Sequence, residues 1–315
     1  MLRNGLSIII PTYNREKQLY NQLKLIFESN INLIEEIVII DNHSDYDILN
    51  LVASFNSNKI RLVRQPFNVK VHNNIAFCFY YVKTEWFWLL SDDDEILDNA
   101  IENIKEEIEE IPSDVGMIKF ARTNSSQKNY IANNLESFID YYINEKIIRR
   151  GDLVFMSTNV YNTIKLKDYL GFAFEYAYTY VPQIVPIIKG LDDKKVSIKF
   201  SDVCIVKYLP PREGNYSFAT VGKGISTFSH IPLNLSKSYR LKFLNIIMSI
   251  NYRSMINFSL KFENTKDFRI IYNNIYRYYL PIYIRFFVEI FILAMNYKMI
   301  RAVLFTLYKL YKRIK

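Results

Sequence analysis

The sequence predicts an α/β protein: a doubly wound sheet followed by a helical, basic C-terminal region. Short apolar runs alternate with amphipathic stretches, two of these runs end directly in carboxylates, and Lys and Arg mix with Tyr and Phe near the end. Alternating strands and helices with short connections are typical of a sheet covered by helices on both faces. The 315 residues, 50% hydrophobic and 23% charged, suffice for a large core and exclude a disordered chain.

The first two strands are predicted from β-branched runs. Residues 6–10 read Leu-Ser-Ile-Ile-Ile, and we expect Pro11-Thr-Tyr-Asn14 to break this strand. Residues 36–41 form the second run, which ends in Asp41. Residues 16–29 between them are expected to be helical, because apolar side chains recur at helical spacing at Leu19, Leu23, Ile26 and Phe27.

The alternation continues to residue 111. Residues 59–64 alternate in polarity as a third strand, and the apolar run from Trp86 to Leu90 is the fourth. Helices are expected at residues 47–55, 73–81 and 97–111. The last of these has an acidic outer face, which we interpret as solvent-exposed surface.

Beyond this point the pattern is less regular. We expect a strand at 115–121, a helix at 135–144, a strand at 153–161, an aromatic-rich stretch at 170–188 interrupted by Pro182 and Pro186, two short strands within 196–208, and a turn-rich loop at 210–224. From Leu233 onward the chain is expected to be mostly helical.

Three consecutive carboxylates, Asp92, Asp93 and Asp94, follow the fourth strand. Unpaired carboxylates are too costly to bury, so we expect them where the strand leaves the sheet. In open α/β sheets ligands bind at that carboxyl edge, and hard oxygen ligands there suit Mg²⁺ or Mn²⁺ bridged to substrate phosphates. The alternative, a solvated acidic turn that caps the next helix, stays open from these residues alone.

Polar groups from several strands converge on the same edge. Asp41 ends the second strand, and the segment Pro11, Thr12, Tyr13 and Asn14 follows the first. Together with the acid triplet they line a crevice suited to a nucleotide, with a ring for stacking, acids for the base and ribose, and a metal on the diphosphate.

In this order and spacing, the three motifs resemble those of the family 2 glycosyltransferases, inverting enzymes of the GT-A fold. The resemblance is strong over about residues 5–125 and weak over 126–210. It implies a catalytic domain at 1–232, with a donor half to about 125 and an acceptor half at 126–232, and a helical region at 233–315. It also implies a nucleotide-sugar donor and Mn²⁺ or Mg²⁺ as cofactor.

The resemblance assigns roles to individual residues. It implies that Thr12 and Tyr13, flanked by Pro11 and Asn14, hold the donor base and that Asp41 reads its edge. Asp92 would lie near the ribose, Asp93 would bind the metal, and Asp94 would support it. The cofactor-binding set that it implies is Pro11, Thr12, Tyr13, Asn14, Asp41, Asn68, Lys70, Asn74 and Asp92.

Two departures concern the donor side. Ser91 stands where many members carry the first Asp, which leaves the register of the triplet open by one residue. Lys70 replaces the glycine of an Asn-x-Gly motif, and it either reaches a phosphate or is a surface lysine. Asn73 and Asn74 either contact the sugar nucleotide or cap the following helix.

The acceptor side offers fewer signals. Inversion needs a base for the acceptor hydroxyl, and the family's usual Glu-Asp pair is missing. Glu175 is the single acid between Gly171 and Gly190, so we take it as the candidate base, against a helix-surface glutamate as the alternative. His230 is a candidate third metal ligand, against a structural histidine.

These features predict glycosyl transfer with inversion from a nucleotide sugar, UDP-linked as a first guess, to a saccharide or undecaprenyl-linked acceptor in cell-surface polysaccharide synthesis such as O-antigen or capsule. A sugar-phosphate nucleotidyltransferase shares the sheet topology, but its Gly-rich, Arg-containing N-terminal loop is missing. A non-catalytic membrane-bound scaffold of the same fold is the alternative from another class.

Composition predicts the surroundings. A net charge of +8 and a pI near 9.1 favour an anionic partner. The basic, aromatic C-terminal region suggests an anionic membrane surface, against a packed helical subdomain or a homodimer interface. No nucleic-acid module pattern is present, so we expect no such partner. The apolar run at 6–10 is too short for a signal peptide, and Cys78 and Cys204 suit a reducing compartment, so we expect the inner face of the plasma membrane.

Overall fold

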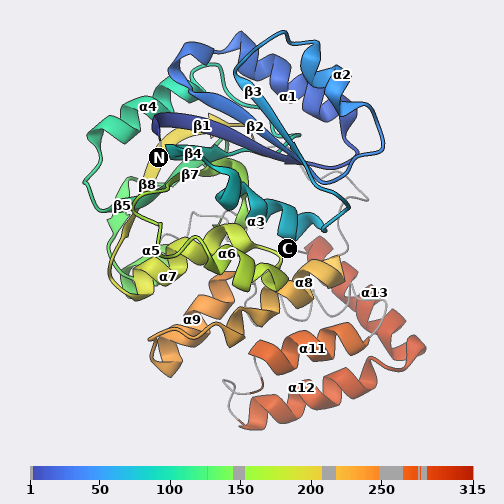
Figure 1. Cartoon of the computed structure of the whole chain (residues 1–315). Coiled ribbons are helices and arrows are strands. Elements are labelled where there is room, and N and C mark those ends of the chain that lie inside the picture. The colour runs from blue at the N-terminus through green and yellow to red at the C-terminus, as the bar shows by residue number, and fades with distance from the viewer. Residues whose placement is uncertain are drawn as a thin grey trace. The chain divides into compact units, whose positions relative to one another are not determined.

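A computed structural model describes residues 3–125, 127–144, 153–207, 218–247, 265–275, 277 and 282–314. The chain divides into two compact units, Met1–Arg212 and Glu213–Lys315, and each is described by itself (Figure 1). The expected boundary between residues 232 and 233 therefore falls inside the second unit. Helix α8 and the turn of 3₁₀ helix at Thr227–His230 precede that boundary, and both pack against α11 of the second unit.

The centre of the first unit is an eight-stranded sheet in the order β3-β2-β1-β4-β7-β5-β8-β6. Its first four strands pair in parallel, as predicted: β1 (Arg3–Thr12), β2 (Glu36–Asp41), β3 (Ile60–Arg64) and β4 (Thr84–Leu89). Strand β1 extends through Thr12, so Pro11 lies within the strand and does not break it. Proline is tolerated there because its missing N–H removes a single hydrogen bond near a strand end.

The other half of the sheet is mixed. Strand β7 is antiparallel to both β4 and β5, and β6 is antiparallel to β8, whereas β5 and β8 are parallel. The bounds are Val115–Arg122 (β5), Tyr130–Ala132 (β6), Asn159–Asn162 (β7) and Ser197–Val206 (β8). The α/β class is confirmed, and the antiparallel strands are an addition to the predicted parallel sheet.

Two predicted strands differ from the structure. The strand expected at 153–161 is shorter, because a 3₁₀ turn at Met156–Thr158 precedes β7. The two short strands expected within 196–208 are one continuous strand, β8. Its pairing with β5 shifts register beside Ala121, which accounts for the break in the sequence pattern.

Helices cover both faces of the sheet (Figure 1). Side chains of α1, α2 and α4 share one core with alternate residues of the strands. On the other face, Phe79 of α3 contacts Phe87 and Tyr161 at centroid distances of 5.3 and 5.2 Å. The bounds are Glu16–Glu28 (α1), Ile48–Ala53 (α2), Val71–Tyr81 (α3), Ala100–Glu110 (α4), Leu135–Asn144 (α5), Phe172–Glu175 (α6) and Val185–Asp192 (α7).

The second unit is helical in its described part. Its helices are Phe218–Ser226 (α8), Lys237–Ile247 (α9), Thr265–Ile275 (α11), Ile282–Ala294 (α12) and Lys298–Ile314 (α13). An ion pair of 2.8 Å between Lys223 and Asp267 joins α8 to α11. The loop expected at 210–224 is wrong from residue 218 on, where α8 begins, and residues 208–217 lie outside the described residues.

Candidate active site

The candidate site lies where the strand order reverses. Strands β2 and β3 follow on one side of β1, and β4 pairs with its other side, so the carboxyl ends of β1 and β4 form a topological switch point. The loops after both strands meet there, because the Thr12 hydroxyl donates to Oδ2 of Asp92 over 2.7 Å. This is the edge at which the sequence predicted a ligand.

Asp92 is buried, which the sequence argument did not expect. Its Oδ1 lies 2.9 Å from Nη1 of Arg15, and this ion pair together with the Thr12 hydroxyl compensates the charge. Burial raises the pKa of Asp92 to about 6, with the Arg15 guanidinium opposing the rise. A paired carboxylate can therefore be buried where an unpaired one cannot.

Asp93 is the more accessible neighbour, with 23% of its side chain exposed. Its Oδ2 lies 2.6 Å from the same nitrogen of Arg15, and its Oδ1 accepts a hydrogen bond of 2.7 Å from the Ser91 hydroxyl. One guanidinium thus bridges two carboxylates. Arg15 was missed from the sequence, although it directly follows the Pro-Thr-Tyr-Asn segment.

Asp94 turns toward a different part of the sheet. Its Oδ2 accepts from the Ser157 hydroxyl at 2.5 Å, and the same hydroxyl oxygen accepts from the Ser91 backbone N–H at 2.9 Å. Burial raises the pKa of Asp94 to about 6, with the Ser157 hydrogen bond opposing it. Nothing in the sequence pointed to Ser157, because only the antiparallel pairing of β4 with β7 brings it to the triplet.

The triplet fits a divalent cation in part. The carboxylate of Asp93 is partly exposed and lies between those of Asp92 and Asp94. One or two such carboxylates suffice for a Mg²⁺ ion whose other ligands are substrate phosphates and water. Within the described ranges, however, no three His, Cys, Asp or Glu side chains form a group that could hold a metal ion. The described residues alone therefore do not provide a complete set of ligands for a cation.

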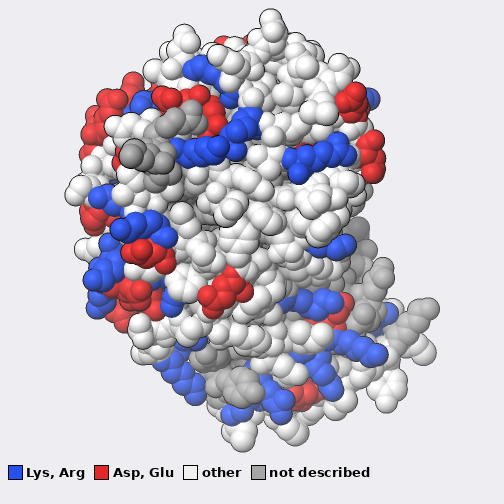
Figure 2. Space-filling model, viewed as in Figure 1, with Lys and Arg blue, Asp and Glu red and all other residues white. Residues whose placement is uncertain are grey.

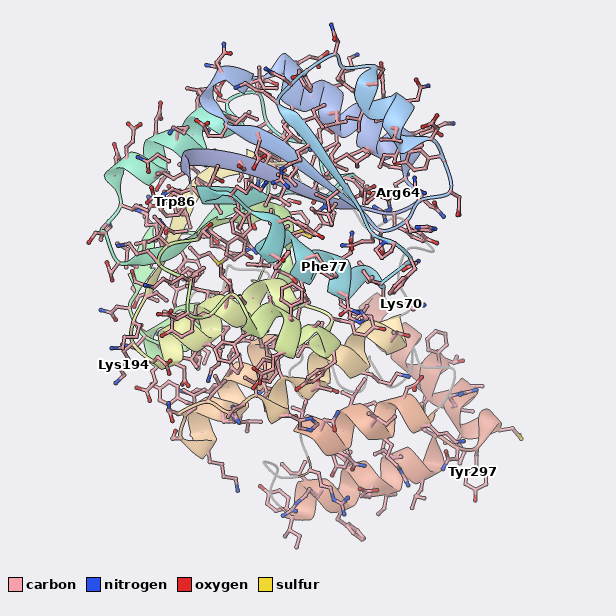
Figure 3. The ribbon with its side chains drawn as sticks, in the orientation of Figure 1. Arg64, Lys70, Phe77, Trp86, Lys194 and Tyr297 are labelled. Carbon is pink, nitrogen blue, oxygen red and sulfur yellow. The ribbon has the colours of Figure 1, made fainter. Side chains whose placement is uncertain are left out.

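Asp41 is fully buried at the end of β2. Its Oδ1 accepts from the Ser44 hydroxyl at 2.5 Å and from the Ser44 backbone N–H at 3.0 Å, and its Oδ2 lies 3.5 Å from Nε of Arg64. Arg64 ends β3, at the same end of the sheet as Lys70, whereas Trp86 lies at the other end of β4 (Figure 3). Asp41 is thus held by Ser44 and Arg64 at the carboxyl end of β2.

Two buried polar atoms near the ends of β2 and β3, Nε2 of Gln65 and Oδ1 of Asn74, have no hydrogen-bond partner in the described part of the chain. Burial and the Asp41 carboxylate raise the pKa of Tyr46 to about 12, so the hydroxyl keeps its proton. Buried polar groups are usually hydrogen-bonded, so an ordered water or a ligand at this edge would complete the hydrogen bonding of the unpaired atoms.

The other predicted donor-side residues lie around this edge. Tyr13 is exposed, and Asn14 bonds Asp45 through both its amide nitrogen and its oxygen, at 2.7 Å each. Asn68 accepts from the Asn42 amide at 3.0 Å, which ties the loops after β2 and β3 together.

Lys70 precedes α3 in a backbone conformation of φ 74° and ψ 155°, which is nearly restricted to glycine. The family's glycine therefore matches the backbone that the fold requires here. Asn73 and Asn74 lie in the first turn of α3 and not at its cap, so the capping alternative is wrong. Instead, the Asn74 amide donates to the Ile40 carbonyl at 2.9 Å.

Glu175 and His230 are not joined to the triplet by any contact among the described residues. Glu175 is exposed at the end of α6, next to Phe174, which contacts Phe77 near the middle of α3 (Figure 3). His230 ends a 3₁₀ turn of the second unit. Both roles stay predictions.

The fold is shared with solved structures, three of which are described next. TarS 1-349 of S. aureus is 16% identical, with a TM-score of 0.57 over 86% of this chain and 78% of that one. Its complex with UDP-GlcNAc is 17% identical, with a TM-score of 0.58 over 86% and 79%. The mannosyltransferase PcManGT from Pyrobaculum calidifontis, in complex with GDP-Man and Mn2+, is 12% identical, with a TM-score of 0.50 over 96% and 84%.

The sequence itself matches the family described as "Glycosyl transferase family 2" over residues 7–164, half of the chain. No curated protein matches it. The matched range includes most of β1, all of β2 to β4 and the acid triplet, and thus the strand ends that form the switch point. Fold and sequence agree with the GT-A resemblance. The chain belongs to glycosyl transferase family 2.

Proposed function

We propose that this glycosyltransferase moves a sugar from a nucleoside-diphosphate donor, UDP-linked, to a saccharide or undecaprenyl-linked acceptor with inversion. The observation that carries the proposal is that Asp41 and the acid triplet lie at the same edge of the parallel sheet, after β2 and β4 on either side of β1, in a family 2 chain. The fold neighbours solved with UDP-GlcNAc, UDP and GDP-Man support a nucleotide-sugar donor. Family membership favours this reading over a nucleotidyltransferase or a scaffold.

Different residues at the carboxyl edge of the sheet would bind different parts of the donor. Asp41, which lies beside Arg64, would accept a hydrogen bond from the base, and Asp92 would face the ribose. Asp93, supported by Asp94, would hold Mn²⁺ or Mg²⁺, which neutralises charge on the departing diphosphate when bound. Glu175 is the proposed base for the acceptor hydroxyl.

The test is release of nucleoside diphosphate from a panel of UDP-, GDP- and dTDP-sugars, with Mn²⁺ and with EDTA. We expect turnover with a UDP-sugar that stops in EDTA. Turnover restricted to GDP-sugars would contradict the UDP assignment, and turnover that EDTA leaves unchanged would contradict the metal. Pyrophosphate-dependent formation of sugar phosphate would instead indicate the nucleotidyltransferase.

We further propose that the second unit binds an anionic membrane surface. Residues 213–315 contain 16 Lys and Arg against 4 Asp and Glu. Helix α12 exposes large apolar side chains along one face, and α13 adds more: Ile282, Tyr283, Phe286, Phe287, Ile290, Leu293, Met299, Ile300, Val303 and Leu307. Apolar patches of this kind beside cations are typical of helices that lie in a membrane interface.

The length and polarity of the described helices bear on whether the second unit would cross the membrane or lie on it. No single described helix is long and apolar enough to cross a membrane, whereas Ile282–Ala294 and Met299–Leu307, bent by 116°, reach that length and composition together. Cosedimentation with phosphatidylglycerol vesicles tests the proposal. Binding should weaken as salt rises and be small on phosphatidylcholine, and equal binding to both lipids would contradict it. The cations at Lys309, Lys312, Arg313 and Lys315 fall where no side chain is described.

A further inference from the structure

The Arg15 guanidinium forms an ion pair with Asp93, the carboxylate to which the proposed function assigns metal binding. Its Nη1 lies 2.6 Å from Oδ2 of Asp93 and 2.9 Å from Oδ1 of Asp92. The second oxygen of Asp93 accepts the Ser91 hydroxyl at 2.7 Å. Both oxygens of Asp93 are therefore engaged within the protein.

We propose that Arg15 makes divalent-cation binding conditional on the donor diphosphate. In the donor-free protein the guanidinium holds Asp92 and Asp93 together, and when the donor enters it turns to the diphosphate and frees Asp93. This inference rests on the proposed function, because it requires a metal-binding role for Asp93.

Electrostatics explains why a cation alone binds poorly. A divalent ion on Asp93 would lie beside the guanidinium, and like charges repel strongly at such separations. The guanidinium would have to move away, and the buried Asp92 would then lose its ion pair with Arg15. Breaking a buried ion pair by removing one partner is strongly unfavourable, so this cost is subtracted from the affinity for the ion.

The donor changes this balance because it brings its own anion. The planar guanidinium can donate two parallel hydrogen bonds to phosphate oxygens. It would therefore give up its contacts with Asp92 and Asp93 and bind the diphosphate instead. Arg15 immediately precedes α1, in the loop after β1 at the switch point, so only its side chain needs to move. Donor and metal then strengthen each other's binding, and this coupling is reciprocal.

The experiment measures Mn²⁺ binding directly, by electron paramagnetic resonance of the free ion, without any donor. We expect Arg15→Gln to bind Mn²⁺ at least tenfold more tightly than the wild type, and Arg15→Lys, which keeps the charge, to resemble the wild type. Ser91→Ala removes the neutral partner of the same carboxylate and should change the affinity less than threefold. Equal or weaker Mn²⁺ binding by Arg15→Gln would overturn the proposal.

An arginine far from the triplet provides the matched control. Arg61 pairs with Glu36 at 2.9 Å between β3 and β2, so Arg61→Gln removes an ion pair of similar length that lies outside the triplet and should leave Mn²⁺ binding unchanged. A gain equal to that of Arg15→Gln would show a general charge effect and overturn the assignment.

Added UDP gives a second readout. The factor by which UDP tightens Mn²⁺ binding should be at least tenfold smaller in Arg15→Gln than in the wild type, and an unchanged factor would overturn the coupling.

If Arg15→Gln does not fold, arginine side-chain NMR of the wild type replaces it, with Arg15→Lys for assignment. The Arg15 Nε–H signal should move on addition of UDP with Mg²⁺, and a signal that stays in place would overturn the proposal. The donor-free result is independent of the sugar-nucleotide assay, so the two can fail separately.

Discussion

Residues 1–212 contain 24 Lys and Arg against 28 Asp and Glu, a net charge of −4, whereas residues 213–315 contain 16 against 4, a net charge of +12. Figure 2 shows acidic side chains gathered over α4 of the first unit and basic ones over helices of the second. The overall +8 thus hides two surfaces of opposite sign. The positive charge belongs to the helical unit and not to the unit with the carboxylate site.

The two units also differ in how they treat apolar side chains. In the first, alternate residues of β4 pack on the two faces of the sheet, with Trp88 and Phe87 fully buried. In the second, α12 buries Val288 and Ile292 on one side and exposes Phe286 and Phe287 on the other. Exposed rings beside cations are what the proposed membrane contact requires of the second unit, whereas the proposed donor site requires the buried carboxylates of the first.

The largest expected effect tests the sheet unit. Asp93→Asn should lower transfer by ~10²–10³-fold, because an amide is a poor ligand for a divalent ion and charge stabilisation of this kind is typically of that size. Stability should change little, since Asp93 is partly exposed. The assay is initial rate of nucleoside diphosphate release, with the exposed Asp98→Asn in the same loop as control. Near wild-type turnover would remove Asp93 from the site.

The next effect tests the helical unit. Phe286 and Phe287 are 64% and 67% exposed, and their replacement by Glu should lower affinity for anionic vesicles by ~10²-fold, because two rings no longer enter the interface. Leu49 of α2 is 66% exposed in the sheet unit, so Leu49→Glu is the control and should bind as the wild type does. Point variants are preferable to truncation of α12, which would also remove the buried side chains Val288 and Ile292. Equal loss in both variants would break the contrast between the units.

A smaller effect concerns the donor base. Asp41→Asn should weaken UDP binding by ~1.5–3 kcal/mol, about 10- to 150-fold, because a charge-assisted hydrogen bond is lost. The amide can still accept from Ser44, so folding should be kept. Calorimetric titration with UDP measures the effect, and donor-free Mn²⁺ affinity should not move. Unchanged UDP affinity would rule out base recognition by Asp41.

The site's acids should also reduce stability at neutral pH. Burial raises the pKa of Asp94 to about 6, so the folded state binds its proton more tightly than the unfolded chain does. Stability from this group is therefore present below about pH 4 and is lost as pH rises through 6. In EDTA, Asp94→Asn should gain ~1–2 kcal/mol at pH 8 and almost nothing at pH 4, measured by urea unfolding. Asp267→Asn, which breaks the exposed pair with Lys223, should gain nothing at pH 8.

The smallest effect is at Lys70. Lys70→Gly should stabilise the fold by ~1 kcal/mol, because φ 74° with ψ 155° strains any residue that has a Cβ atom. The relief of strain is partly offset, since glycine has a larger conformational entropy in the unfolded chain. Lys194→Gly is the control, since φ 56° there lies in the more tolerated left-handed region. Thermal unfolding measures both. A greater gain at Lys194 would contradict the strain at Lys70.

Local patterns predicted the donor half well. The run at 36–41 is a strand of those bounds, and the helix at 16–29 differs from α1 by one residue, because β-branched runs and 3.6-residue periodicity persist in a buried parallel sheet. Beyond residue 125 the predictions were weaker. Strands β6 and β7 are only three and four residues long, and a strand this short carries little periodicity, so β6 was not predicted and β7 was predicted only as the end of a longer strand.

The sequence by itself determined the α/β class, the acid triplet at a strand end and the concentration of positive charge near the C-terminus, since each is written in consecutive residues. Only the tertiary structure decided how the triplet is held. Arg15 reaches Asp92 and Asp93 from 77 and 78 positions away, and Ser157 reaches Asp94 from 63. Such contacts depend on strand order and register, which put β1 and β7 on either side of β4. The charge state and accessibility of a carboxylate are set by these neighbours, so they follow from the fold and not from the local pattern.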